Sequence, residues 1–322
     1  DTIGKKMTVC QLYAKQIRHR GNVRYNTKNG RKRLMKLLEE DKLGGCPIDS
    51  VKLSDAKEWA IRMKEKGISY KTISNDKRSL KAAFYTAIQD DCIRKNPFDF
   101  QLNTVIEDDT EPKVPLTPAQ EESFLSFAQN DKVYQKYYDE LIILLGTGLR
   151  ISELCGLTDT DINFENRIIN VDHQLLRSAE TGYYIETPKT KSGIRQIPMS
   201  EKVYEAFNRV LKRRRGAKAV TIDGYSNFLF LNRDGYPKTA TNYDGMFRGL
   251  AKKYNKYHEE ALPKVMTPHT LRHTFCTNMA NAGMNPKALQ YIMGHSNITM
   301  TLNYYAHATF DSAKAEMLRI AA

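Results

Sequence analysis

Six residues in the second half of the sequence carry side chains that could act together on a phosphodiester. They are Arg150, Lys191, His269, Arg272, His295 and one of two adjacent tyrosines, Tyr304 or Tyr305. Two guanidiniums can clamp the nonbridging oxygens of a phosphate with planar, bidentate geometry. Imidazoles can donate hydrogen bonds or move protons, an ammonium can protonate a departing alkoxide, and a tyrosine is a competent oxygen nucleophile. Each residue alone has an ordinary structural explanation, so only the six residues taken together indicate chemistry on a phosphodiester.

The neighbouring residues indicate where these side chains lie in the chain's local structure. Arg150 follows a glycine turn at the start of a helix, and His269 and Arg272 are three apart on one helical face. His295 follows a glycine that could end a helix. Each position is therefore held at a turn or on a short helix, where a side chain can be aimed.

The lysine lies in a basic segment, residues 189–198, which we interpret as the tip of a hairpin. This segment offers two lysines, Lys189 and Lys191. We prefer Lys191 because it is closer to the turn, and Lys189 remains the alternative.

A metal centre is not expected from the same residues. His269 and His273 are i, i+4 on one helix with Cys276 nearby, but no glutamate lies between them and Arg272 would repel a cation. The sequence holds no carboxylate cluster suited to two-metal chemistry. The Gly-Thr-Gly stretch at 146–148 lacks the further glycine or lysine of nucleotide-binding motifs. We therefore expect no metal and no cofactor.

Charge points to a polyanionic partner. The 322 residues carry 50 Lys and Arg against 37 Asp and Glu, a net charge of +13. Residues 1–100 hold 23 basic and 12 acidic side chains, so most of the excess lies in the first third of the chain. This asymmetry favours double-stranded DNA or another nucleic acid. An acidic membrane surface is the second candidate for a polyanionic partner, after nucleic acid. The longest strongly apolar run is too short to span a bilayer, and our prediction is a nucleic-acid partner and no membrane.

The five cysteines are scattered and odd in number, which excludes a disulfide framework and fits a reducing cytoplasm. The chain begins with Asp1 rather than methionine, so we expect it to be part of a longer protein.

Two domains are expected, a first at 1–105 and a second at 116–322, joined by an acidic, proline-flanked linker at 106–115. The first domain reads as all helix, with helices predicted at 7–18, 28–40, 54–66 and 70–88. The last of these combines an apolar stripe with four basic residues that lie mostly off it. We predict that these basic residues contact DNA phosphates: Lys71, Lys77, Arg78 and Lys81.

The second domain reads as helices around one small antiparallel sheet. Its strands are predicted at 167–172, 183–187 and 193–198, and its helices at 121–128, 137–145, 201–214, 243–254, 269–282, 286–293 and 310–320. Thr117, Pro118 and Gln120 form a helix start signal directly after the linker. The fold class is therefore mainly α with a small antiparallel β-sheet, an α+β arrangement.

The order of these motifs resembles the tyrosine recombinase, or phage integrase, family. The resemblance rests on four stretches in family order, namely Thr-Gly-Leu-Arg at 147–150, Thr-Lys-Ser-Gly at 190–193, His-x-x-Arg at 269–272 and Gly-His-Ser at 294–296. Two further stretches, 90–98 and 283–290, are similar to integrases of conjugative transposons.

The resemblance implies a site-specific recombinase that clamps DNA between a helical core-binding domain and a catalytic domain. Arg150 and Arg272 would stabilise the pentacoordinate phosphate, His269 and His295 would hydrogen-bond it, and Lys191 would be the general acid. The tyrosine would form a 3′-phosphotyrosyl link, without ATP or a metal. Protomers would act as a dimer on one site and as a tetramer in synapsis through a Holliday junction, with accessory DNA-bending proteins as possible partners. The helix at 310–320 would dock on a neighbouring protomer.

Two adjacent tyrosines compete for the role of nucleophile. The family's tyrosine usually lies nine residues after the histidine of the Gly-His pair, which selects Tyr304, whereas the common Tyr-x-His ending at His307 selects Tyr305. We prefer Tyr304, because His295 and the nucleophile must meet on one phosphate. A type IB topoisomerase and a non-catalytic DNA-binding factor are the alternative functions; the separate basic domain argues against the first and the full six-residue set against the second.

Overall fold

The computed structural model describes residues 7–21, 23–111, 114–188, 190–214, 220–305 and 317–318. The chain divides into two compact units, an N-terminal unit (Asp1–Pro112) and a C-terminal unit (Lys113–Ala322). The division falls inside the segment 106–115 that the sequence marks as a linker.

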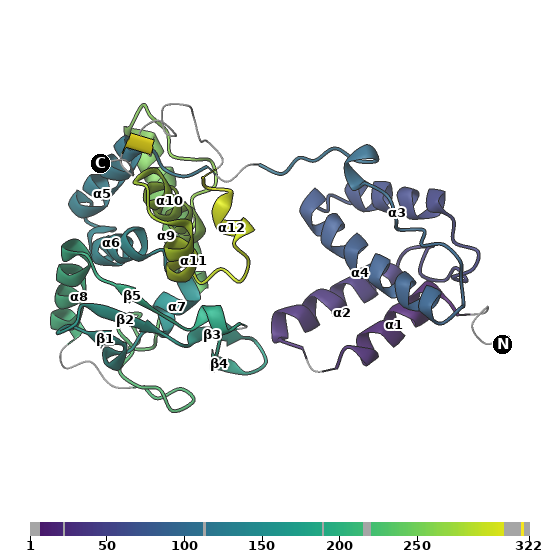
Figure 1. Cartoon of the computed structure of the whole chain (residues 1–322), viewed down its shortest axis with the longest axis horizontal. Coiled ribbons are helices and arrows are strands. Elements are labelled where there is room, and N and C mark those ends of the chain that lie inside the picture. The colour runs from purple at the N-terminus through teal and green to yellow at the C-terminus, as the bar shows by residue number, and fades with distance from the viewer. Residues whose placement is uncertain are drawn as a thin grey trace. The chain divides into compact units, whose positions relative to one another are not determined.

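The N-terminal unit is helical, as predicted (Figure 1). Its helices are α1 (Val9–His19), α2 (Tyr25–Glu39), α3 (Leu53–Glu65) and α4 (Tyr70–Gln89). Helix α1 packs on α2 and α4, and α3 packs on α4. The unit also contains the short 3-10 helix η2 (Leu102–Thr104).

The core of this unit forms around aromatic side chains and the apolar stripe of α4. Trp59 contacts Phe98 edge-on with ring centroids 5.7 Å apart, and Phe84 of α4 lies 5.3 Å from the same ring. All three side chains are fully buried. Burial of this apolar surface fixes α4, so its basic residues lie on the remaining faces.

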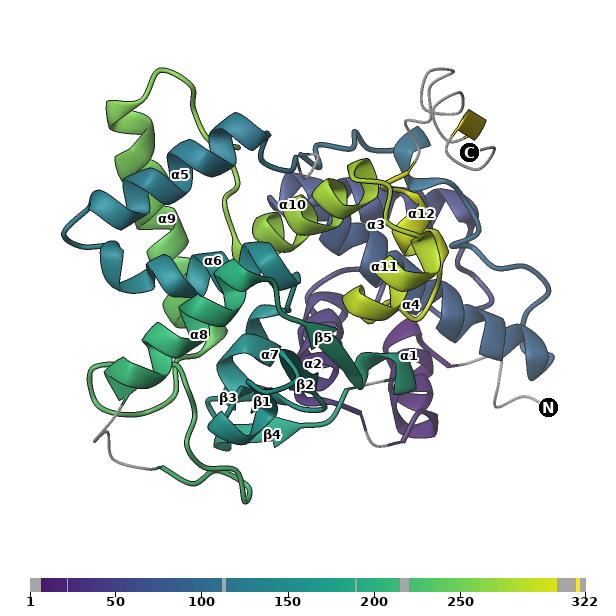
Figure 2. The same cartoon turned by 60° about the vertical axis from the view of Figure 1, so that its left-hand side comes forward.

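The C-terminal unit contains eight described α-helices around two small sheets (Figure 2). The helices are α5 (Pro118–Asn130), α6 (Tyr138–Thr147), α7 (Ile151–Gly156), α8 (Glu201–Arg214), α9 (Ala240–Tyr257), α10 (Pro268–Asn281), α11 (Pro286–Met293) and α12 (Thr299–Leu302). Helix α6 is central and packs against α8, α10 and α5. The predicted start of α5 is confirmed, because Thr117 and Gln120 form a reciprocal capping box with Pro118 in the first turn.

The sheet prediction is wrong in its pairing. One antiparallel sheet has the order β1 (Ile162–Asn163), β2 (Ile168–Val171) and β5 (Arg195–Pro198). The predicted strand at 183–187 instead belongs to a separate hairpin of β3 (Gln174–Ser178) and β4 (Gly182–Glu186). β5 pairs with β2 in the register that sets Ile197 opposite Ile169 and Arg195 opposite Val171, so that these four residues lie on the buried face.

The lysine segment is consequently not the tip of a β4–β5 hairpin. Lys191–Gly193 forms a 3-10 turn, η5, that leads directly into β5. β3 was not predicted because its residues, Gln-Leu-Leu-Arg-Ser, include no β-branched or aromatic side chain.

None of the helices in the described part of the chain is long and apolar enough to cross a membrane. The predicted helix at 310–320 lies outside the described residues apart from 317–318, and so do Lys189 and His307.

Candidate active site

The candidate site is built around the C-terminal end of α11. Three consecutive backbone carbonyls there each accept a hydrogen bond from a different arginine. Arg195 Nε donates to Ile292 O (2.6 Å), Arg272 Nη2 to Met293 O (2.5 Å) and Arg150 Nη2 to Gly294 O (3.1 Å). The last carbonyls of a helix lack intrahelical partners and carry partial negative charge, so cations gather there naturally. The arrangement brings Arg150 and Arg272 of the predicted set together with Arg195.

Two glycines make this close approach possible. Gly148 ends α6 in the left-handed conformation (φ 63°) and turns the chain into Arg150, the N-cap of α7. Its carbonyl accepts a further bond from Arg272 Nη1 (2.5 Å). Gly294 ends α11 with φ 60°, and a Cβ there would lie 3.0 Å from Ser192 O. Both local predictions, a glycine turn before Arg150 and a helix end at Gly294, are therefore confirmed.

Within the described residues one carboxylate, Glu153, is bonded in this group and offsets the guanidinium charges. Its oxygens accept a bidentate pair from Arg195 (3.0 and 2.9 Å), and they also accept from the backbone N–H of Arg150 (2.9 Å) and from Arg150 Nη1 (2.8 Å). Glu153 and Arg195 are both buried. With three positive charges against one negative charge, this group of side chains has a net charge of +2.

The charges change the protonation of the buried members. Burial by itself would raise the pKa of Glu153, but its bonds to Arg195 and the nearby charges of Arg150 and Arg272 lower that pKa to about 2. Burial and the neighbouring guanidiniums of Arg150 and Arg195 lower the pKa of Arg272 to about 9. Both groups remain charged at neutral pH, so the positive site is permanent under those conditions.

His295 lies directly beyond the end of α11 and is buried. Burial and the positive charges of Arg272, Arg150 and Arg195 lower its pKa to about 4, so the ring is neutral at neutral pH. Its Nδ1 lies 2.9 Å from the hydroxyl of Thr301 on α12. If that hydroxyl donates to Nδ1, the single ring proton is on Nε2 and is available for a bound phosphate.

The other two predicted polar residues lie at the rim. His269 is an exposed residue in the first turn of α10, and it is close enough to His295 that a proton on its ring would help to lower the pKa of His295. Lys191 is exposed on the η5 turn. The turn reaches the site through its backbone, since Gly193 O accepts a hydrogen bond from Arg195 Nη1 (3.0 Å).

The two candidate tyrosines differ in their surroundings. The hydroxyl of Tyr305 donates to Met284 O (2.5 Å). Tyr304 is half-buried with its ring 4.8 Å from that of His273, and no described residue accepts a hydrogen bond from its hydroxyl. Burial raises the pKa of Tyr304 to about 12, while the charge of Arg272 opposes that shift.

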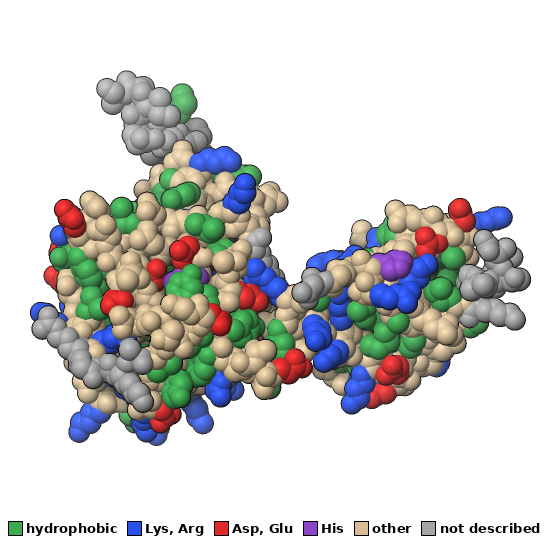
Figure 3. Space-filling model, turned by 90° about the horizontal axis from the view of Figure 1, so that it is seen from below, with side chains coloured by type: hydrophobic (Ala, Val, Ile, Leu, Met, Phe, Trp, Pro, Cys, Tyr) green, Lys and Arg blue, Asp and Glu red, His purple; other side chains and the backbone are tan. Residues whose placement is uncertain are grey.

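The predicted DNA contacts on α4 fall into two pairs. Lys71 and Arg78 are exposed. Lys77 lies over the ring of Phe100 at 4.5 Å, and Lys81 is bonded to Asp99 at 2.5 Å. The second pair therefore has partners within its own unit. Figure 3 shows further Lys and Arg side chains on the surface of this smaller, right-hand body.

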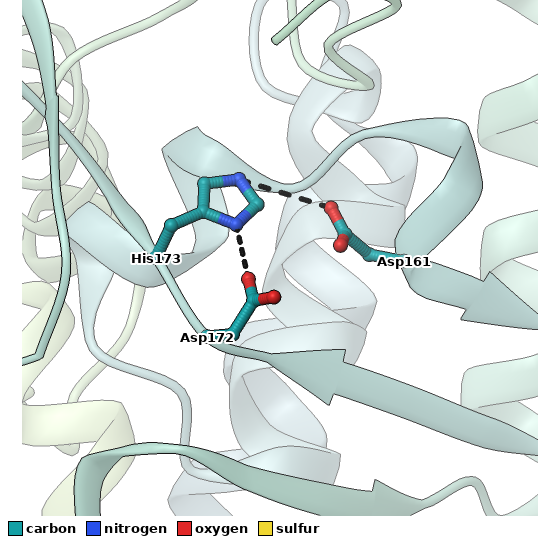
Figure 4. Close-up of side chains that lie close together, drawn as sticks. All are labelled: Asp161, Asp172 and His173. Atoms are coloured by element: carbon teal, nitrogen blue, oxygen red, sulfur yellow. Dashed lines mark hydrogen bonds and ion pairs between the residues drawn. The ribbon is translucent and has the colours of Figure 1, made fainter. Parts of the chain in front are cut away.

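Three other residues come close enough to be tested as a metal centre: Asp161, Asp172 and His173 (Figure 4). His173 Nδ1 lies 2.5 Å from Asp172 Oδ1, and its Nε2 lies 2.7 Å from Gly156 O and 3.9 Å from Asp161 Oδ2. Each ring nitrogen already faces an oxygen acceptor, so neither directs a lone pair at a cation shared with the carboxylates. We interpret the group as a contact that holds the segment before β3 against the end of α7.

Comparison with known proteins identifies the family. The model of the phage integrase family matches residues 115–312, which include the whole cluster at the end of α11. The chain belongs to the phage integrase family. It is a tyrosine recombinase, an enzyme that cuts and rejoins DNA.

Two phage integrase relatives span nearly the whole chain. The transposase from transposon Tn916 of Enterococcus faecalis is 69% identical over 320 residues, which are 99% of this chain and 79% of that protein. The integrase of transposon Tn1549, in complex with a circular intermediate DNA, is 78% identical with a TM-score of 0.93 over 98% of this chain and 99% of that chain. A second structure of that integrase, in complex with transposon right end DNA, has a TM-score of 0.92. The predicted family and fold class are confirmed.

Three residues of this candidate site were not predicted from the sequence: Glu153, Arg195 and Thr301. Glu153 stands three residues after Arg150, the spacing of a capping box, and this signal was present in the sequence. Arg195 is 42 positions from Glu153, and Thr301 has the appearance of an ordinary short-helix residue. No local pattern could have paired them.

Proposed function

We propose that this recombinase attacks a DNA phosphate with the hydroxyl of Tyr304 while Arg150 and Arg272 hold the nonbridging oxygens. The observation that carries the proposal is the group of three guanidiniums around one carboxylate at the end of α11. Each of the two proposed phosphate ligands uses some of its N–H groups on the protein and keeps others for an anion. A fixed positive charge in a partly desolvated site stabilises a phosphoryl transition state strongly.

The bond changes follow from these roles. The oxygen of Tyr304 bonds to phosphorus, and the bond from phosphorus to the 5′-oxygen breaks. Lys191 gives its proton to that oxygen, which leaves a free 5′-hydroxyl and a 3′-phosphotyrosyl link. Since the new link conserves the phosphodiester bond, attack by another 5′-hydroxyl restores DNA without ATP, and the guanidiniums take the place that a metal ion would have.

The two histidines assist at the phosphate. The neutral ring of His295 donates one hydrogen bond without adding to a charge that is already positive. His269, at the exposed rim, is the candidate for a second hydrogen bond and for accepting the proton that Tyr304 loses.

Two observations support Tyr304 over Tyr305. The hydroxyl of Tyr305 already bonds Met284 O, so it would have to break that bond to attack. One of the two Tn1549 integrase structures carries an arginine-to-lysine substitution, and the other carries a tyrosine-to-phenylalanine substitution. The two substituted positions are 154 residues apart. Arg150 and Tyr304 are also 154 apart, in a chain aligned to that integrase over 98% of its length.

Double-stranded DNA is the substrate and partner. The Tn1549 integrase, 78% identical, is seen with circular intermediate DNA and with transposon right end DNA. We assign residues 1–105 as a helical core-binding domain, with 106–115 as linker and 116–322 as the catalytic domain. Exposed Lys71 and Arg78 would contact phosphates directly. Lys77 and Lys81 would first have to give up Phe100 and Asp99.

Recombination exchanges four DNA strands, and each active site cuts one strand. The working assembly is therefore a tetramer, formed from two dimers that are each bound to one DNA site. Its host compartment is the bacterial cytoplasm. A reducing compartment suits five cysteines that are all free thiols in this chain.

A nicked suicide duplex tests the proposal, because loss of the short fragment beyond the cut traps the covalent complex. The probe is the transposon right end sequence bound by the Tn1549 integrase. Tyr304→Phe should bind this DNA and form no covalent band on a denaturing gel, whereas Tyr305→Phe should form one. The reverse pattern would move the nucleophile by one residue, and no band from the unmodified chain would reject the mechanism.

A further inference from the structure

Arg195 joins three segments of the site through four hydrogen bonds. Its side chain is completely shielded from solvent. One guanidinium bonds both oxygens of Glu153 on α7, Gly193 O of the η5 turn and Ile292 O of α11. Among the arginines that the structure describes in the C-terminal unit, only Arg195 bonds three such segments.

Each of these segments supplies one residue of the proposed chemistry. Glu153 is the carboxylate that fixes Arg150, the η5 turn begins with Lys191, and α11 ends two residues before His295. The guanidinium of Arg195 therefore helps to fix the positions of Arg150, Lys191 and His295.

The η5 turn also lies directly on the end of α11. A Cβ on Gly294 would be 3.0 Å from Ser192 O and 3.1 Å from Arg195 Nη1, so only the absence of a side chain permits the contact. On its other side, a Cβ on Gly193 would be 2.3 Å from Pro188 Cβ. The η5 turn is thus packed between Pro188 and Gly294, and the bond from Arg195 to Gly193 O holds the turn in place between them.

We propose that Arg195 is a positioning residue that holds Lys191 at the departing 5′-oxygen. The proposal rests on the proposed function, in which Lys191 is the general acid. Lys191 has an exposed, flexible side chain, and the only fixed geometry available to it is that of the turn from which it extends. A turn displaced by about 1 Å would leave the ammonium in place as a charge but misaligned for proton transfer, with a large loss of rate.

A change of leaving group separates this role from simple support of Glu153. A substrate with sulfur in place of the bridging 5′-oxygen releases a thiolate, which needs no protonation because thiols are far more acidic than alcohols. Loss of the acid, or of its position, should matter little on that substrate. Loss of the phosphate clamp should matter equally on both substrates.

The test measures single-turnover cleavage of right end duplexes with oxygen or sulfur at the scissile 5′ position. Arg195→Lys retains a positive charge for Glu153, but its one nitrogen has three N–H donors and cannot reproduce the four bonds that Arg195 makes from three nitrogens of a planar guanidinium. It should cleave the oxygen substrate about 10- to 100-fold more slowly, as for residues that orient catalytic groups, and the sulfur substrate at near the unmodified rate. Arg167→Lys, at an exposed arginine paired with Glu201, is the matched control and should cleave both normally.

Equal slowing on both substrates, or no slowing on either, would overturn the proposal. If thermal unfolding shows that Arg195→Lys does not fold, Gly294→Ala displaces the same turn without changing any charge and is judged by the same two outcomes. Lys191→Met tests the proposed function separately. Failure of sulfur to rescue Lys191→Met would remove Lys191 as the acid, whatever Arg195 does.

Discussion

Replacing Glu153 by glutamine should destabilise the C-terminal unit by about 3 kcal/mol. The substitution keeps the size of the side chain but removes the carboxylate that bonds Arg150 and Arg195 and that lies within the electrostatic influence of Arg272. Arg195, which is fully buried, would be left with a neutral partner. Breaking one side of a buried ion pair typically costs about 3–5 kcal/mol, because the remaining charge is desolvated without compensation.

The pKa of Glu153 gives the same magnitude independently. The pKa is lowered from 4.5 to about 2, and each unit corresponds to about 1.4 kcal/mol, so the charged form contributes about 3 kcal/mol to folding. Because the folded-state pKa lies below the unfolded one, this stability is fully present above pH 4.5. It is lost as the pH falls from 4.5 toward 2. In the glutamine variant this part of the pH dependence should disappear.

Urea unfolding followed by two probes measures the effect unit by unit. The only tryptophan, Trp59, lies in the core of the N-terminal unit, so its fluorescence reports that unit alone. Far-ultraviolet circular dichroism reports both units. Glu153→Gln should shift the circular dichroism transition and leave the Trp59 transition in place, while Glu122→Gln, at an exposed glutamate of α5, should shift neither.

A loss below about 1 kcal/mol at neutral pH, the range of an exposed ion pair, would refute the reasoning. It would mean that water or another group compensates Arg195 in solution, and the positive site would then be less desolvated than the geometry indicates.

The remaining predictions concern the turn, a histidine and the DNA. Gly294→Ala should slow cleavage far more than Gly182→Ala. Both glycines have a positive φ, 60° at Gly294 and 71° at Gly182, but only at Gly294 would a Cβ meet other atoms, with Ser192 O the nearest. The difference between the cleavage rates of the two folded variants therefore measures the effect of this contact. The pKa of His295 is lowered from 6.5 to about 4, so between these pH values the unfolded chain binds a proton that the folded chain does not. The free energy of unfolding should therefore fall as the pH drops from 6.5 toward 4. In the same urea assay, His295→Gln should make the free energy of unfolding less dependent on pH over this range. Binding of right end DNA should weaken steeply with salt, and a slope near zero in a plot of log affinity against log salt concentration would contradict the phosphate contacts proposed for the N-terminal unit.

Local signals in the sequence predicted the parts of the site that are formed by neighbours in the chain. Gly148, two residues before Arg150, and Gly294, directly before His295, mark helix ends, because a left-handed residue can end a helix and redirect the chain that follows. The helices of the N-terminal unit were found for a similar reason, since apolar residues recur on one face of each. These features need only a few consecutive residues to form.

Features that depend on distant segments were not predictable. The pairing of β5 with β2 skips the β3–β4 hairpin, and the bond from Arg195 to Glu153 joins residues 42 positions apart. Arg195 was visible in the sequence as part of a basic segment, but an arginine in such a segment is more often exposed than buried. Only the folded arrangement reveals that it lies between α7, the η5 turn and α11.

The most direct test of the central claim is to identify the residue that carries DNA. The unmodified chain is trapped on the nicked right end duplex, digested with nuclease and trypsin, and sequenced by tandem mass spectrometry. The tryptic peptide that follows Lys287 contains both Tyr304 and Tyr305, so fragmentation between them is required. We predict a 3′-linked nucleotide on Tyr304. A nucleotide on Tyr305, or on any residue other than these tyrosines, would contradict the account.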